Sequence, residues 1–111
     1  MQKIIKVDDK DIRFSTGFAW MLKYKSQFKE DVAKVIIPAT SSASKDKTGL
    51  GAIEAIGFVG IGRIAWACAA VCDKDILPPD QWFDSFDEFP VIQIATELLP
   101  EVFASFSAKK K

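Results

Sequence analysis

The side chains best suited to chemistry in this 111-residue chain are two cysteines, Cys68 and Cys72. Their spacing of four residues places both thiols on one face of a helix, inside a long apolar run. A metal site there would need further Cys or His ligands, and the chain has no His. A disulfide within one helix is geometrically awkward. We therefore expect two free cysteines that fill space in the core, and no bound metal.

The lack of histidine also removes the commonest general base and the usual partner of a catalytic Ser or Cys. Carboxylates gather in the segment DQWFDSFDEF, at Asp80, Asp84, Asp87 and Glu88. A calcium-binding EF-hand loop needs alternating oxygen ligands and a glycine, whereas aromatic residues interrupt this segment. We expect no enzyme, no catalytic residue and no cofactor.

Three glycines, Gly57, Gly60 and Gly62, read G-x-x-G-x-G, the reverse of the dinucleotide-binding fingerprint. No predicted strand leads into them, so the pattern does not favour a nucleotide site. Glycines in a helix more often let another backbone come close.

These glycines belong to an apolar run at residues 49–72 that carries only two charges, Glu54 and Arg63. As a helix, the run would be roughly 36 Å long. It is long enough to span a membrane, but Arg63 near its middle would cost about 3 kcal/mol there. We favour a central helix that is apolar all round and covered on nearly every side, in part by a second chain.

Composition agrees with a protein that binds other proteins. The chain is 49% hydrophobic, with nine Phe and three Trp, which is more apolar surface than one small domain needs. Basic and acidic residues balance at 15 each, so a general electrostatic grip on nucleic acid is not indicated.

The pattern of the whole chain predicts an α+β fold that is mostly α. We expect a single domain at 1–111, in which an N-terminal β-hairpin is followed by about four to five helices packed around the central apolar helix. The predicted segments are a β-hairpin at 1–14, a first helical region at 15–37 with a second stretch from 30, a loop at 39–48, the central helix at 49–72, a short helix at 80–86 and a C-terminal helix at 90–107.

Local signals refine these segments. KIIKV and DIRF are expected to pair about an aspartate-rich turn, although that turn lacks the favoured Asn-Gly. Asp80 is expected to cap the short helix. Pro100 should kink or split the last helix after Leu99, because proline removes one ladder hydrogen bond.

The first helix has two apolar patches. Its main apolar side is expected to hold Phe18, Met21, Leu22 and Phe28, behind an N-cap at Ser15 and Thr16. Trp20 and Tyr24 form a second patch beside Lys23. Aromatic rings among lysines could stack on single-stranded nucleic acid. We favour an ordinary amphipathic helix whose lysine stems shield apolar surface.

Taken together, the hairpin KIIKVDDKDIRF, the helix TGFAWMLKYKSQF, the polar loop SSASKDKT, the apolar helix and DQWFDSFDEFP before a final helix resemble the tail assembly chaperones of siphophages of Gram-positive bacteria. The resemblance covers nearly all of the chain and rests on patterns rather than on an invariant signature. It implies a small, mostly helical, non-enzymatic homo-oligomer of the host bacterial cytoplasm. Such proteins coat the tape measure protein and help recruit the tail tube protein.

The predicted function is therefore binding and solubilising the tape measure protein during tail tube assembly, by helix-in-groove contacts. Candidate protein-binding residues, chosen from the aromatic and apolar surplus, are Trp82, Phe83, Phe86, Leu99, Phe103 and Phe106. This hypothesis involves no nucleic acid and no membrane. Its main alternative is a small membrane-associated phage protein, holin-like or anchoring, that uses residues 49–72 as a span. A third possibility is a nucleic-acid module that uses Trp20, Tyr24 and the lysines of the first helix.

Overall fold

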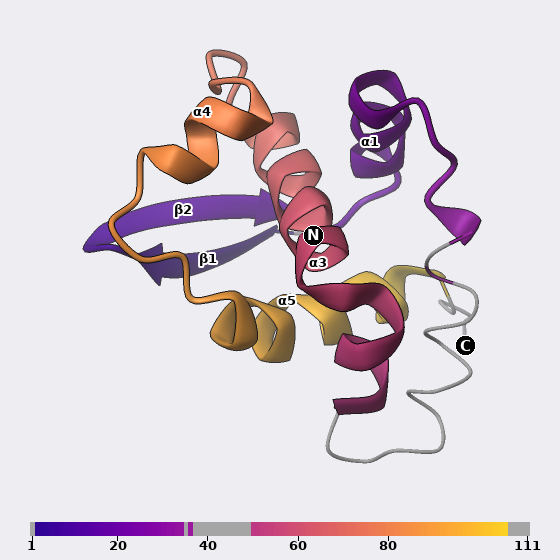
Figure 1. Ribbon diagram of the computed structural model, residues 1–111. Coiled ribbons are helices and arrows are strands. Elements are labelled where there is room, and N and C mark those ends of the chain that lie inside the picture. Colours follow the sequence, from indigo (N-terminus) through magenta and orange to yellow (C-terminus); the bar gives the residue numbers. More distant parts are fainter. Residues whose placement is uncertain (1, 35, 37–49, 107–111) are drawn as a thin grey trace.

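The computed structural model describes residues 2–34, 36 and 50–106. Within them the chain forms a two-stranded antiparallel hairpin followed by four helices, an α+β fold that is mostly helical (Figure 1). The elements are β1 (Gln2–Val7), β2 (Lys10–Ser15), α1 (Ala19–Phe28), α3 (Leu50–Cys72), α4 (Pro79–Asp84) and α5 (Val91–Phe106). The described helices therefore number four rather than four to five. The predicted loop at 39–48 lies outside the described residues, as does part of the helical stretch predicted at 30–37.

The predicted N-terminal hairpin is confirmed, and its turn consists of two aspartates. The register places Val7 opposite Lys10, which leaves only Asp8 and Asp9 between the strands. Both have positive φ, at 55° and 66°. Positive φ at both central residues is typical of the type I′ turn, whose twist matches that of a hairpin. Aspartate tolerates this conformation better than most residues, so the turn forms without Asn-Gly.

One face of the hairpin is buried and the other is open. Ile5, Val7 and Phe14 are buried, whereas Ile4, on the opposite face, is 55% exposed. Such alternation is expected of an antiparallel pair with one covered face. β2 packs on α3 and β1 on α5. The backbone N–H of Asp87 donates to Asp8 Oδ2 at 3.1 Å, which ties the hairpin turn to the connection between α4 and α5.

Helix α1 buries only part of the apolar side that we predicted: Met21 and Phe28 pack against the core, but Phe18 and Leu22 do not. Trp20 and Tyr24 are almost fully buried, while Phe18 and Leu22 are 69% and 63% exposed. Only one side of α1 meets α3, and turning the large Trp and Tyr rings to that side buries the most apolar area. The predicted cap is also displaced. Phe18 occupies the N-cap position without a side-chain hydrogen bond, and the Ser15 hydroxyl accepts from Gly17 N–H at 3.4 Å instead.

Helix α3 is not the single, fully covered apolar helix that the sequence predicted. Its helical residues are interrupted at Gly57, with φ 83° and ψ 157°, a conformation that is essentially restricted to glycine. After this break, Phe58 and Val59 are exposed. Because the break redirects the chain, the two parts of α3 meet different surroundings (Figure 1).

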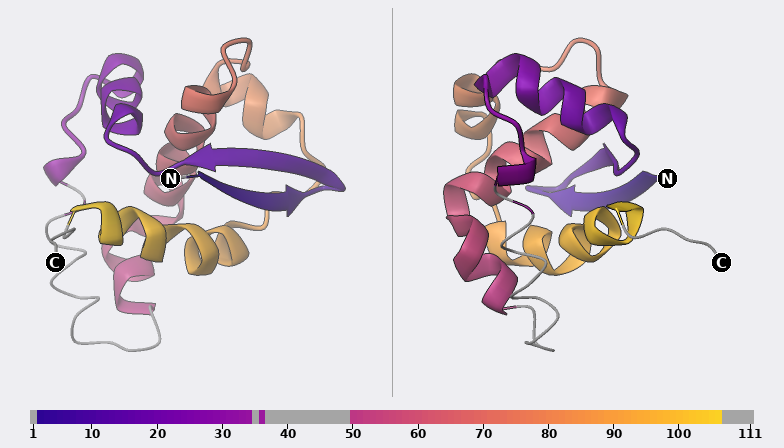
Figure 2. Two further views of the ribbon diagram at one scale, coloured as in Figure 1. Left: turned by 180° about the vertical axis from the view of Figure 1, so that it is seen from behind. Right: turned by 90° about the vertical axis from the view of Figure 1, so that its right-hand side faces the viewer.

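The C-terminal part of α3 lies in the core. Its buried hydrophobic residues are Ile61, Ile64, Ala65, Trp66, Ala67, Cys68, Ala69 and Ala70. α3 packs against α1, β2, α4 and α5. Helices α1 and α5 lie on opposite sides of the molecule, with the hairpin and this part of α3 between them (Figure 2). Small alanine side chains allow these neighbours to approach closely.

The last two helices begin near their predicted positions. Pro78 is the extended N-cap residue of α4 and Pro79 is its first helical residue, so Asp80 lies in the first turn and is not the cap. An acidic residue in the first turn still complements the helix dipole. α5 continues through Pro100 and is not split there. Ile94, Leu98 and Val102 form its buried face.

Candidate functional site

The two cysteines that could have carried chemistry are free thiols in or beside the core. Cys68 is fully buried, and burial raises the pKa of its thiol well above the usual value, with a smaller contribution from Cys72. A thiol kept protonated in this way is a poor nucleophile and a poor metal ligand. In residues 2–34, 36 and 50–106, no group of three or more Cys, Asp or Glu side chains is placed to hold a metal ion.

The aromatic residues of α1 are used in packing. Trp20, Tyr24, Phe28 and Trp66 form a chain of ring contacts with centroid separations of 6.4, 4.9 and 5.8 Å. The Tyr24 hydroxyl donates to Glu30 Oε1 at 3.3 Å. Burial, and then the charge of Glu30, raise the pKa of Tyr24 above its ordinary value, against a smaller lowering by Arg63. Trp20 and Tyr24 therefore present no ring for a nucleic-acid base to stack on.

The six candidate protein-binding residues divide by exposure. Trp82, Phe86 and Leu99 are buried, with 6%, 9% and 4% of their surface exposed. Phe83 and Phe103 are half-buried. The side chain of Phe106 lies outside what the structure describes. The five candidate side chains that the structure describes do not form one exposed surface, and the role of all six in binding stays a prediction.

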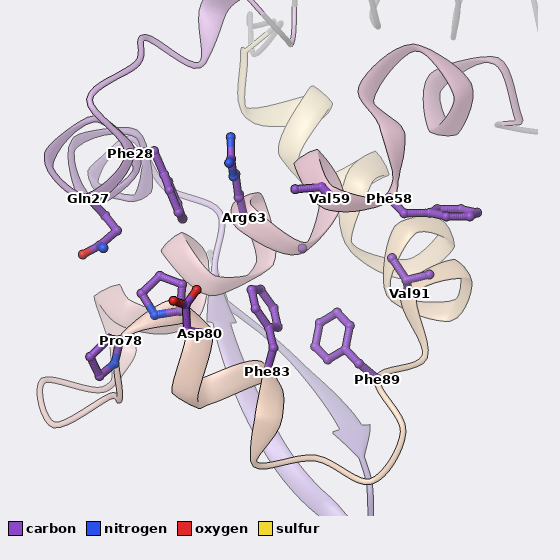
Figure 3. A pocket seen from close by; sticks show the side chains of 12 residues that line it. Gln27, Phe28, Phe58, Val59, Arg63, Pro78, Asp80, Phe83, Phe89 and Val91 are labelled. Carbon is purple, nitrogen blue, oxygen red and sulfur yellow. The ribbon is translucent and has the colours of Figure 1, made fainter.

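Phe83 contributes to an open groove of about 600 Å³ (Figure 3). This volume lies in the range of typical ligand-binding clefts. The groove runs between the end of α1, the middle of α3, the start of α4 and the segment leading into α5. Its lining residues are Gln27, Phe28, Phe58, Val59, Gly62, Arg63, Pro78, Pro79, Asp80, Phe83, Phe89 and Val91.

One wall of the groove is a tightly packed aromatic cluster. Phe83 and Phe89 meet edge to face with their centroids 5.2 Å apart, and both contact the Trp82 ring, at 5.1 and 5.6 Å. Phe86 packs on Trp82 from a third side, at 5.1 Å. Edge-to-face contacts of this kind stabilise a fixed ring arrangement. The buried Trp82 thus positions Phe83 and Phe89, which face the groove.

Gly62 forms the floor of the groove beside Phe83. A Cβ atom at position 62 would lie 3.2 Å from Phe83 Cζ, tighter than ordinary van der Waals contact. Glycine here therefore lets an aromatic ring, rather than another backbone, approach the helix. Gly57 has a different role, because a Cβ there would meet nothing within 4 Å and only its positive φ requires glycine.

The opposite wall comes from α3 and α1. Phe58 and Val59 are 57% and 69% exposed at the mouth of the groove. Figure 3 shows Phe58 at the same end of the groove as Val91. The Arg63 guanidinium lies over the Phe28 ring, 5.1 Å from its centroid. Such a cation–π contact holds the charged group at the edge of the groove.

A backbone anchor positions the α4 side. Trp66 Nε1 donates to the carbonyl oxygen of Leu77 at 2.9 Å. This bond fixes the segment just before Pro78, where the chain leaves the turn after α3 and enters α4. The groove is therefore supported by a buried residue of the core helix.

Sequence reasoning missed most of the groove. Phe58 and Val59 were counted with the buried helix, Phe89 with the acidic-aromatic segment DQWFDSFDEF, and Val91 with the last helix. The signal that could have found the first pair is Gly57, since a glycine in an otherwise apolar helix can mark a break after which side chains point elsewhere. The other pair meets α3 only through the tertiary fold.

In the described part of the chain, no helix is both long and apolar enough to cross a membrane. Comparison with known proteins identifies no relative: no family model matches the sequence, and neither a curated protein nor a solved structure matches it.

Proposed function

We propose that this chain is a phage tail assembly chaperone that binds and solubilises the tape measure protein during tail tube assembly. The observation that carries the proposal is the open apolar groove, with Phe58 and Val59 exposed at its mouth. Monomeric proteins seldom leave large side chains gathered at an open cleft unless something binds there. The pattern of hairpin, helices and acidic-aromatic segment supplies the identity of the partner by resemblance.

A groove of this kind suits a helical client. An amphipathic helix lays apolar side chains spaced three and four residues apart into a hydrophobic groove, and its polar side stays in water. A long helical protein with an exposed apolar stripe would aggregate before the tail tube encloses it. Covering that stripe is the chaperone's proposed task, in the host bacterial cytoplasm.

The proposal extends to self-association and to recruitment of the tail tube protein. Phe18 and Leu22 on α1 lie outside the groove and are exposed by more than half. They offer a second apolar surface for another copy of the chain. Phe58 and Val59, the part of α3 left uncovered here, would be covered by the bound client instead.

Co-expression with the tape measure protein of the encoding phage tests this function. We expect the client to move from the insoluble to the soluble fraction and to co-purify with the chain. The double variant Phe58→Ala/Val59→Ala should lose most of this effect, because it removes the apolar mouth of the groove. Both side chains are largely exposed, so the variant should fold normally.

The matched control is Ile4→Ala/Ile92→Ala, which removes two apolar side chains that are each 55% exposed and lie outside the groove. It should solubilise the client as the unmodified chain does. Client solubility that is unchanged by the unmodified chain would overturn the proposed function. If both double variants lose client solubilisation equally, then the groove is not the site where the client binds.

A further inference from the structure

The neutral overall charge hides a strong separation along the chain. From residue 75 to residue 108 there are seven acidic residues, namely Asp75, Asp80, Asp84, Asp87, Glu88, Glu97 and Glu101, and no Lys or Arg. This stretch includes α4, one wall of the groove and the segment leading into α5. The aromatic wall therefore belongs to a stretch of chain that carries negative charge and no positive charge.

Two of these carboxylates lie where a bound helix would meet them. Asp80 lines the groove, and Asp84 is one helical turn further along α4. Residues four apart lie on the same face of a helix, and like charges there repel each other by a few tenths of a kcal/mol. Both side chains are exposed to solvent. A cation brought by a partner would relieve this repulsion.

The nearby cations of the chain are directed elsewhere. Arg63, on the opposite wall, is held over the Phe28 ring and interacts with Tyr24. Lys10, from the hairpin, lies over the Phe86 ring with its Nζ 5.6 Å from the centroid. Phe86 belongs to the side of the aromatic cluster away from the groove, since it does not line it. Asp80 and Asp84 remain available to a ligand.

We propose that the groove selects a basic amphipathic helix. Its apolar side chains enter between the Phe58–Val59 pair and the Phe83–Phe89 wall, and Lys or Arg residues along one edge pair with Asp80 and Asp84. This inference rests on the proposed function and specifies which segments of the tape measure protein are bound, namely those with lysines or arginines beside the apolar stripe. Arg63 on the other wall disfavours a basic residue there, so the opposite charges of the two walls also set the orientation of the helix in the groove.

Two designed peptides test the inference without the client. Each has about 18 residues, roughly 27 Å as a helix, and the same leucine stripe at three- and four-residue steps. One carries lysines along a single edge of the stripe and the other carries glutamates at the same positions. Binding of each to the full chain is measured by fluorescence anisotropy at about 0.05 M and 0.5 M salt.

We expect the lysine peptide to bind at least tenfold more tightly than the glutamate peptide at low salt, and the difference to shrink at high salt. Asp80→Asn/Asp84→Asn should weaken the lysine peptide about three- to tenfold, because it removes two exposed ion pairs. Asp73→Asn/Asp75→Asn, at an exposed turn outside the groove, is the matched control and should change little. Phe58→Ala/Val59→Ala should weaken both peptides about tenfold or more.

Equal binding of the two peptides, or lysine-peptide binding that ignores the Asp80/Asp84 change, overturns the charge preference even if the client is still solubilised in co-expression. If the unmodified chain does not solubilise the client but still prefers the lysine peptide, then the proposed function is wrong. The preference of the groove for a basic helix would still hold. A second copy of the chain could occupy the groove and block the peptide. The chain would then self-associate in a concentration-dependent way that Phe58→Ala/Val59→Ala abolishes, and this result too would overturn the proposal.

Discussion

The two parts of α3 on either side of the core boundary have similar composition and opposite surroundings. From Ile61 to Ala70 nearly every side chain is buried, whereas Phe58 and Val59, only a few residues earlier, are more than half exposed. Both stretches are apolar, so hydrophobicity does not distinguish them. Both stretches follow the break at Gly57, so what separates them is the cover supplied by α1, β2, α4 and α5. Apolar residues of one helix thus form the core from Ile61 to Ala70 and a candidate binding surface at Phe58 and Val59.

The largest difference between the two parts of α3 is expected when one side chain in each is truncated. Ile64→Ala should lower the free energy of unfolding by about 2–5 kcal/mol, because Ile64 is fully buried and its loss leaves a cavity. Val59→Ala should change it by no more than about 0.5 kcal/mol, because that side chain is already largely in water. Urea titrations with equal m-values compare the two. Similar losses for both variants would mean that Val59 is covered in solution.

A smaller effect is expected at the break itself. Gly57→Ala should destabilise the chain by about 1–3 kcal/mol, since alanine strongly disfavours the conformation at φ 83° and ψ 157°. The added Cβ would meet no atom within 4 Å, so backbone strain alone is measured. The variant should also weaken groove binding, because Phe58 and Val59 would be displaced. If alanine instead raises both stability and helical circular dichroism, then α3 is continuous at residue 57 and the described break is wrong.

The smallest effect concerns Tyr24, whose ring helps to cover the buried part through Phe28 and Trp66. Because folding raises its pKa, the folded chain holds the phenolic proton more tightly than the unfolded chain does. This contribution to stability is complete below the ordinary pKa of about 10 and is lost as pH rises through the higher folded-state pKa. Tyr24→Phe should therefore flatten the loss of stability as the pH rises past the ordinary tyrosine pKa of about 10.

Urea unfolding of both proteins at each pH measures this difference. Lysines ionise in the same range in both proteins, so only the comparison at matched pH isolates Tyr24. The chain has a single tyrosine, whose ultraviolet absorbance reports its ionisation directly. An ordinary tyrosine titration in the folded chain would show that the ring is solvated and that α1 covers α3 less fully than described.

Much of the local structure could be predicted from the sequence. The hairpin follows from two short β-rich runs around aspartates, and the observed helices Leu50–Cys72 and Val91–Phe106 agree with the ranges 49–72 and 90–107 to within a residue or so at each end. The buried position of Cys68 was also expected. These features depend on residues close together in the chain, where periodicity and turn chemistry act directly.

The errors arose where one segment had two possible faces. On α1, both Phe18 with Leu22 and Trp20 with Tyr24 form apolar patches at helical spacing, and periodicity alone does not say which of them meets the core. Burial of the larger rings against α3 decided it. The groove is a stronger case, because its walls come from segments around residues 28, 60, 80 and 90, which no local pattern brings together.

By itself, the sequence determined the hairpin, the mostly helical character, the lack of histidine chemistry and the excess of apolar side chains. Only the tertiary structure decided which of those side chains are covered and which remain open at the groove. The physical reason is that hydrophobic burial is non-directional: an apolar residue favours any cover, and the cover available depends on elements far away in the chain.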